Sequence, residues 1–123
     1  MLDHIVLPVS SFVSSFTFYS TVLGELGVEP IKRGHRRAGF GRNGKPEFFI
    51  FEGDVTAPGL HFAFVADDRQ MVDDFYAAAM AAGATDNGAP GLRPDYHPNY
   101  YGAFVYDPDG YNIEAVCHLF EAS

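Results

Sequence analysis

Hydrophobic residues along the chain follow two spacings, and these predict a strand followed by a helix, twice over. The strands fall at 2–9 (LDHIVLPV) and 60–66 (LHFAFVA), which are short apolar runs. Each is followed by apolar residues three or four positions apart, a spacing typical of an amphipathic helix. These residues are Phe12, Phe16, Tyr19, Leu23 and Leu26 in the first helix and Val72, Phe75, Tyr76, Ala79 and Met80 in the second.

The residues that flank each predicted helix agree with its ends. Ser10-Ser11 and Asp67-Asp68 precede the two apolar stripes, and both residue types are favoured N-caps. Gly27 and Gly83 follow the stripes, where glycine can end a helix in the left-handed conformation.

Turn residues predict a pair of strands after each helix. The strands are expected at 36–41, 46–52, 100–106 and 111–119. Asn43-Gly44 joins the first two as a tight hairpin, and Asp107-Pro108-Asp109-Gly110 joins the last two. Residues 53–59 are a connection rich in breaker residues, and the proline-rich segment 88–99 is predicted to be a loop.

The two halves of the chain repeat one another. His4 and His61 lie 57 residues apart, as do Phe18-Tyr19 and Phe75-Tyr76. The later turns lie 66 residues apart, because the second half contains the extra loop. Matched histidines, aromatic pairs and turns in the same order indicate two copies of one β-α-β-β(-β) unit.

Composition limits the classes of function. The chain has 123 residues, enough for one domain, and 16 acidic against 8 basic residues give a net charge of −8. An acidic chain is a poor nucleic-acid binder, and no apolar run is long enough to span a membrane. The single cysteine excludes an intrachain disulfide and a cysteine-cluster metal site. The N-terminal residues do not show the basic segment followed by a long apolar segment that is typical of a secretory signal peptide, so we expect a cytoplasmic protein.

The basic residues are unevenly distributed. Six of them fall between positions 32 and 45, where there is no Asp or Glu: Lys32, Arg33, Arg36, Arg37, Arg42 and Lys45. They fit a solvated strand pair and turn. They also fit a rim that attracts anions, or a patch that docks onto an acidic surface of a partner subunit.

Two histidines and one glutamate form a candidate metal site. His4 and His61 hold equivalent places in the opening strands, and the offset of 66 pairs Glu114 with Phe48. Glu114 stands between apolar residues, and a buried carboxylate is costly unless it is paired or bound to a cation. Two imidazoles and a carboxylate suit divalent Fe, Mn, Zn, Co or Ni and leave positions open for substrate. Taken singly, each of the three is more often a core or solvated side chain.

The same residues carry a resemblance to a known family. DHIVLPV, GLHFAF and DPDGYNIEAV resemble the vicinal oxygen chelate superfamily, which includes glyoxalase I, extradiol dioxygenases, fosfomycin-resistance proteins and bleomycin-binding proteins. The resemblance covers nearly the whole chain. It implies an α+β fold of two βαβββ modules, about 1–54 and 59–123, in a single domain with a curved mixed sheet flanked by helices. It also implies a homodimer and a metal that chelates two oxygens of a small substrate.

Carried over residue by residue, the resemblance assigns His4, His61 and Glu114 as ligands. The fourth ligand position of glyoxalase I falls on Phe48, which cannot bind a metal and is expected to contact substrate instead. A shift of one residue in register brings Glu47 to that position but also turns the side chain to the other sheet face. The three-ligand set resembles those of the dioxygenases and the fosfomycin-resistance transferases.

The proline-rich loop and the strand after it supply further candidates. Arg93 is suited to bind a carboxylate or phosphonate, and Tyr96 and Tyr100 to line the substrate site. His97 is a candidate general base and Tyr101 a candidate proton donor, beside Glu114 as the third catalytic residue. His118 shares a strand face with Glu114.

Three functions remain open at this stage. The first is an enzyme of lyase, ring-cleaving dioxygenase or thiol-transferase type, with a divalent metal as Lewis acid. The second is a metal-free protein of the bleomycin-resistance type that binds a cationic, planar drug by stacking and charge. The third is a subunit in which the ligand set is idle. The modules pair either within one chain or across a dimer, which would divide the ligands between two chains.

Overall fold

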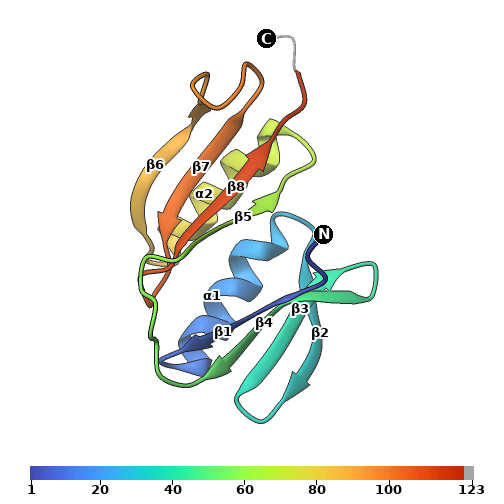
Figure 1. The fold of residues 1–123 in the computed structure, drawn as a ribbon, viewed down its shortest axis with the longest axis vertical. Helices are drawn as coiled ribbons and strands as arrows, with labels where there is room; N and C mark the ends of the chain where they lie inside the picture. The colour runs from blue at the N-terminus through green and yellow to red at the C-terminus, as the bar shows by residue number, and fades with distance from the viewer. Residues whose placement is uncertain (121–123) are drawn as a thin grey trace.

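The computed structural model describes residues 1–120, and the end of the second predicted module, 121–123, lies outside the described residues. Two βαβββ units follow one another along the chain, as the repeat predicts (Figure 1). The first unit consists of β1 (Ile5–Val9), α1 (Phe12–Gly24), β2 (Glu29–Gly34), β3 (Arg37–Arg42) and β4 (Lys45–Glu52). The second consists of β5 (His61–Val65), α2 (Arg69–Ala81), β6 (Thr85–Leu92), β7 (Tyr101–Tyr106) and β8 (Asn112–Cys117).

Each unit forms its own four-stranded mixed sheet. The strand orders are β1-β4-β3-β2 and β5-β8-β7-β6, so the opening strand of each unit pairs in parallel with its last strand. Figure 1 shows the sheets toward opposite ends of the long axis, one from each half of the chain. The architecture is the α+β fold of two βαβββ modules expected from the sequence.

The helix ends and the first hairpin form as the sequence predicts. The side chains of Ser11 and Asp68 accept hydrogen bonds from backbone N–H groups in the first turns of α1 and α2. Gly27 and Gly83 have φ angles of 73° and 90°, the left-handed conformation that glycine adopts most easily. Residues 43 and 44 also have positive φ, as a tight hairpin turn between β3 and β4 requires.

Two strands were missed, and both lie at sheet edges. β6 extends through residues 85–92, so the first part of the predicted loop 88–99 is a strand and the loop begins at Arg93. β2 has no predicted counterpart. Both have polar, proline-containing sequences (EPIKRG and TDNGAPGL) and irregular registers. An edge strand has only one paired neighbour and tolerates such residues, which removes the alternating pattern that would identify it.

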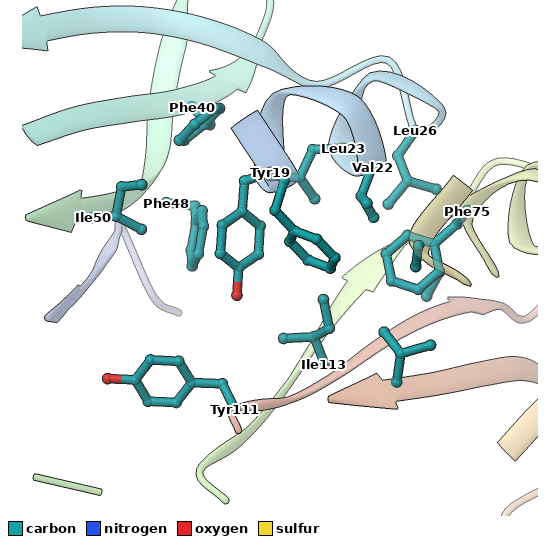
Figure 2. Close-up of a cluster of buried hydrophobic side chains, with 14 of the residues drawn as sticks. Tyr19, Val22, Leu23, Leu26, Phe40, Phe48, Ile50, Phe75, Tyr111 and Ile113 are labelled. Atoms are coloured by element: carbon teal, nitrogen blue, oxygen red, sulfur yellow. The ribbon is translucent and has the colours of Figure 1, made fainter. Parts of the chain in front are cut away.

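One hydrophobic core joins the two units. Figure 2 shows Val22 of α1 and Leu26, just after this helix, near Phe75 of α2, while Tyr19 lies beside Phe48. The Asp107 carboxylate accepts a hydrogen bond from the Tyr19 hydroxyl, which ties the turn between β7 and β8 to α1. Burial of this carboxyl raises its pKa.

The strand registers correct the predicted correspondence between the halves. Ile5 pairs with Phe48, and Phe62, its counterpart 57 residues later, pairs with Ile113. Phe48 therefore corresponds to Ile113, and the residue that corresponds to Glu114 is Phe49. The prediction that Phe48 holds this position was wrong because the two hairpin connections differ in length. Arg42 pairs with Lys45 in the first hairpin, whereas Tyr106 pairs with Asn112 in the second.

Successive residues of a strand point to opposite faces, so this shift moves the aromatic side chain from one face to the other. Phe48 is buried and packs on Tyr19, whereas Phe49 lies on the face away from the helix. We call the face of each sheet that points away from its helix its open face. The first open face includes His4, Val6, Phe49 and Phe51, and the second includes His61, Phe104 and Glu114.

Candidate metal centre

His61 and Glu114 meet on the second open face, on the neighbouring strands β5 and β8. The His61 Nε2 atom lies 3.1 Å from the Oε1 atom of Glu114. The Nδ1 atom of His61 lies 2.9 Å from the backbone oxygen of Asn112. Glu114 is only 1% exposed, while the His61 side chain is 46% exposed, so one candidate ligand is buried in the protein and the other faces solvent.

The hydrogen bond at Nδ1 fixes which ring nitrogen of His61 is available. A carbonyl oxygen only accepts, so Nδ1 carries the proton. In the neutral imidazole, Nε2 then presents its lone pair toward the carboxylate oxygen of Glu114. Two electron-rich atoms in this position require a proton or a cation between them. An imidazole held by its other nitrogen on a backbone carbonyl is also the usual arrangement of a metal-binding histidine.

Tyr100 holds the other oxygen of the carboxylate. Its hydroxyl donates a hydrogen bond to Oε2 of Glu114. Burial raises the pKa of Glu114, and burial together with the adjacent carboxylate raises the pKa of Tyr100 well above its ordinary range. Tyr100 therefore remains a donor, and the carboxylate is oriented with Oε1 toward His61.

An aromatic wall and a glycine shape the space around this pair. The Phe104 ring stacks on His61 at 5.9 Å between centroids, and the Arg93 guanidinium lies 5.4 Å from the Phe104 centroid. A Cβ atom at Gly102 would lie 3.1 Å from both Oε2 of Glu114 and the Tyr100 ring. Glycine at this position allows tyrosine and carboxylate to approach each other across β7.

The loop between β6 and β7 packs its aromatic residues against Tyr100. The rings of Tyr96 and His97 lie 4.8 and 5.7 Å from the Tyr100 ring, and that of His118 lies 5.1 Å away. His97 Nδ1 accepts from the backbone N–H of Asn99, and its Nε2 atom contacts Nδ1 of His118. Both nitrogens of His97 are thus engaged, one within the loop and one with His118 after β8, so in this arrangement His97 positions His118 and Tyr100.

Tyr101 lies on the other side of β7. Its hydroxyl donates to the Asp73 carboxylate of α2 at 2.6 Å, on the helix-covered face of the sheet. The structure therefore does not bring the hydroxyl of Tyr101, the predicted proton donor, together with Glu114. The tyrosine beside Glu114 is Tyr100, because alternate strand residues face opposite ways.

His4 lies apart from the other two predicted ligands. It lies on the first open face, where its ring makes an edge contact of 5.6 Å with Phe49 and its Nδ1 atom lies 2.7 Å from Asp3. Among residues 1–120, no three His, Cys, Asp or Glu side chains come together to hold a metal ion. A site with all three predicted ligands is therefore not formed within one chain.

The donor set fits part of the ligand shell of a divalent transition metal. One imidazole nitrogen and one carboxylate oxygen converge, and each is held by a further hydrogen bond, as ligands of Fe, Mn, Zn, Co or Ni usually are. The sequence analysis missed Phe104 and Gly102 as parts of this site. The register of the last hairpin was the available signal, because it places Phe104 directly opposite Glu114.

Comparisons with known proteins agree with the fold. The family model described as "Glyoxalase/Bleomycin resistance protein/Dioxygenase superfamily" matches residues 1–115. No significant match to a curated protein was found. None of the helices in residues 1–120 is both long and apolar enough to cross a membrane.

Several solved structures are similar over nearly the whole chain. A glyoxalase/bleomycin resistance protein from Albidiferax ferrireducens T118 is 30% identical with a TM-score of 0.81, covering 93% of this chain and 96% of that one. A glyoxalase/bleomycin resistance protein/dioxygenase family enzyme from Burkholderia phytofirmans PsJN is 21% identical with a TM-score of 0.74, covering 95% and 98%. A glyoxalase/dioxygenase from Nostoc punctiforme is 23% identical with a TM-score of 0.72, covering 98% and 92%. With the family model matched over residues 1–115, the chain belongs to the glyoxalase/bleomycin resistance protein/dioxygenase superfamily.

Proposed function

We propose that the protein is a metal-dependent enzyme whose site is shared between two copies of the chain. His61 and Glu114 of one copy hold the metal together with His4 of the other. The observation that carries this proposal is the buried Glu114 carboxylate, whose Oε1 atom lies 3.1 Å from Nε2 of His61. A buried carboxylate in such a position is costly unless a cation compensates it.

Two copies are needed because each chain carries the ligands on separate sheets. The open faces of both sheets contain exposed apolar residues, including Val6 and Phe51 on the first and Val65 on the second. Pairing the first open face of one copy with the second open face of another covers both surfaces. By symmetry it forms two identical sites, each with three ligands.

The residues around the ligands assign a role to each part of the site. When bound, the metal supplies a Lewis acid for two adjacent oxygens of a small substrate. Tyr100 keeps the Glu114 carboxylate oriented, and Phe104 restricts the movement of the His61 ring. Arg93 stacks on Phe104 and donates to the backbone oxygen of Ala89, which keeps a positive charge beside the site.

Metal content tests this proposal directly. We expect about one divalent metal per chain in freshly purified protein, and its loss in Glu114→Ala and His61→Ala. His35→Ala is the matched control, because it removes an exposed imidazole from the turn between β2 and β3. Far-ultraviolet circular dichroism verifies that each variant folds.

Two results would overturn the proposal. The first is the same metal content in Glu114→Ala as in the unmodified protein. The second is no metal in the unmodified protein after reconstitution with Fe(II), Mn(II), Zn(II), Co(II) and Ni(II) in turn. The second result would favour the metal-free binding protein that the sequence analysis left open.

A further inference from the structure

A hollow of about 440 Å³ lies on the first open face, away from His61 and Glu114. Its floor is apolar and includes Val6, Phe49 and Phe51, all from the adjacent strands β1 and β4. Its volume is within the range of small-molecule sites, which are mostly apolar with a few polar groups. None of the three candidate metal ligands lines this hollow. At the position that corresponds to Glu114 of the second sheet, the first sheet has the apolar Phe49.

Two glycines give the hollow its shape. A Cβ atom at Gly39 would lie 2.6 Å from the Phe49 ring, so only glycine allows this ring to lie across β3. A Cβ atom at Gly34 would lie 2.8 Å from Nε of Arg37, so this side chain lies across β2 in the same way. The aromatic floor and a cationic edge are therefore both held flat against the sheet.

Lys32 and Arg37 line this hollow, and neither forms an ion pair with any residue in 1–120. This is unusual in a chain with 16 acidic and 8 basic residues. The other members of the basic stretch are all engaged. Arg36 pairs with Glu52, Arg42 with Asp67, and Lys45 with Asp3, while Arg33 lies 4.1 Å from the Phe16 ring centroid.

Cations without partners at the edge of an apolar hollow favour one class of ligand. We propose that the hollow binds a small carboxylate with an aromatic or branched apolar body. The body would lie on Phe49, and the carboxylate would accept hydrogen bonds from Lys32 and Arg37. A cationic ligand would be repelled by the same two side chains.

The position of His4 connects this hollow with the metal centre. Its ring contacts Phe49, which is the floor of the hollow. In the shared site proposed above, on which this inference rests, His4 binds the metal held by His61 and Glu114 of the other copy. A molecule in the hollow then extends toward the metal, so the substrate is an amphipathic anion held by the first sheet and activated at the second.

Three small probes test the ligand class on the full chain treated with chelator. Phenylacetate carries the anion, benzyl alcohol is neutral, and 2-phenylethylamine is cationic. In two-dimensional amide NMR titrations we expect phenylacetate to bind at least about tenfold more tightly than either of the others. The amides of Gly34 and Gly39 should shift.

A pair of double variants tests the residues. Lys32→Gln with Arg37→Gln is expected to weaken phenylacetate binding about tenfold. Arg36→Gln with Lys45→Gln removes the same charge from cations that already have carboxylate partners, and should leave binding unchanged. Equal binding of the three probes, or equal effects of the two double variants, would overturn the inference.

The two proposals fail separately in this design. Glu114→Gln should lose metal and still bind phenylacetate in chelator, because the carboxylate is not part of the hollow. The Lys32→Gln, Arg37→Gln variant should bind phenylacetate about tenfold more weakly and retain the metal content of the unmodified protein. Loss of phenylacetate binding in Glu114→Gln in chelator, or loss of metal in the double variant, would contradict the separate roles assigned to the two faces.

Discussion

Mixing two variants that each lack one candidate ligand distinguishes a shared metal site from a site within one chain. His4→Ala removes a candidate ligand just before β1, and Glu114→Ala removes one in β8. Each variant alone forms dimers in which both sites are incomplete. In a mixed dimer, one site takes His4 from the Glu114→Ala chain and Glu114 from the His4→Ala chain, so it is complete. The other site lacks both ligands.

The expected amount of metal follows from this geometry. Random assembly of equal amounts makes about half of the dimers mixed, and each mixed dimer has one complete site of two. The mixture should therefore recover about one quarter of the metal content of the unmodified protein. Co-expression with two different affinity tags allows the mixed dimer to be isolated, and native mass spectrometry counts one metal in it.

A control with the opposite expectation strengthens the experiment. The chain with both substitutions is combined with the unmodified chain. In a shared site, each site of this mixed dimer lacks one ligand, so no site is complete. A site within one chain would leave one intact site in this dimer and none in the first. Metal in the control dimer, or none in the first mixed dimer, would refute the reasoning.

Three further substitutions test individual contacts. Tyr100→Phe removes the hydroxyl that donates to Glu114, so metal affinity, measured in competition with a chelator, should fall about 10-fold. Tyr96→Phe is the control and should leave the affinity unchanged. Equal metal affinities of the two variants would contradict the role of Tyr100 in orienting the Glu114 carboxylate. Burial raises the pKa of the Asp107 carboxyl, so the folded state binds a proton there more tightly than the unfolded state does. The free energy of unfolding therefore falls as pH rises from the pKa of the unfolded state through the higher pKa of the folded state. Asp107→Asn should flatten this dependence in urea unfolding measured at a series of pH values, and an unchanged slope would refute it. Tyr19→Phe removes the hydrogen bond to Asp107 and should lower the free energy of unfolding by about 2 kcal/mol at pH 7. An unchanged free energy of unfolding would show that this hydrogen bond does not stabilise the fold.

The parts of the fold that the sequence predicts are those with strong local signals. Both helices, the opening strands β1 and β5, the later strand pairs β3–β4 and β7–β8 and the turn at Asn43-Gly44 have a clear apolar run, spacing or turn. The edge strands β2 and β6 have neither, since solvent replaces one neighbour and their residues do not alternate. Their pairing partners, rather than their own sequences, make them strands.

The candidate site was predicted in its residue types but not in its arrangement. His61 and Glu114 come from strands that pair directly, so a correct alignment of the repeat places them together. The error at Phe48 arose because the turns were aligned by their glycines, although the hairpin connections differ in length. The separation of His4 from the other ligands depends on how the two sheets pack, and no local pattern encodes that packing.

The open faces of the two βαβββ units carry different side chains at corresponding positions. Phe49 occupies the place of Glu114, and Gly39 occupies the place of Phe104, because the paired positions correspond in the two registers. The first face has one histidine and no carboxylate at the corresponding position, which is too few ligands for a metal.

The second face has two candidate ligands, and the cations Lys32 and Arg37 lie in the other half of the chain. Neither face alone has both a complete ligand set and a place for an anion. A site with both functions requires the two faces to meet. Because His4 lies away from His61 and Glu114 within one chain, the proposed function assigns the missing face to a second copy.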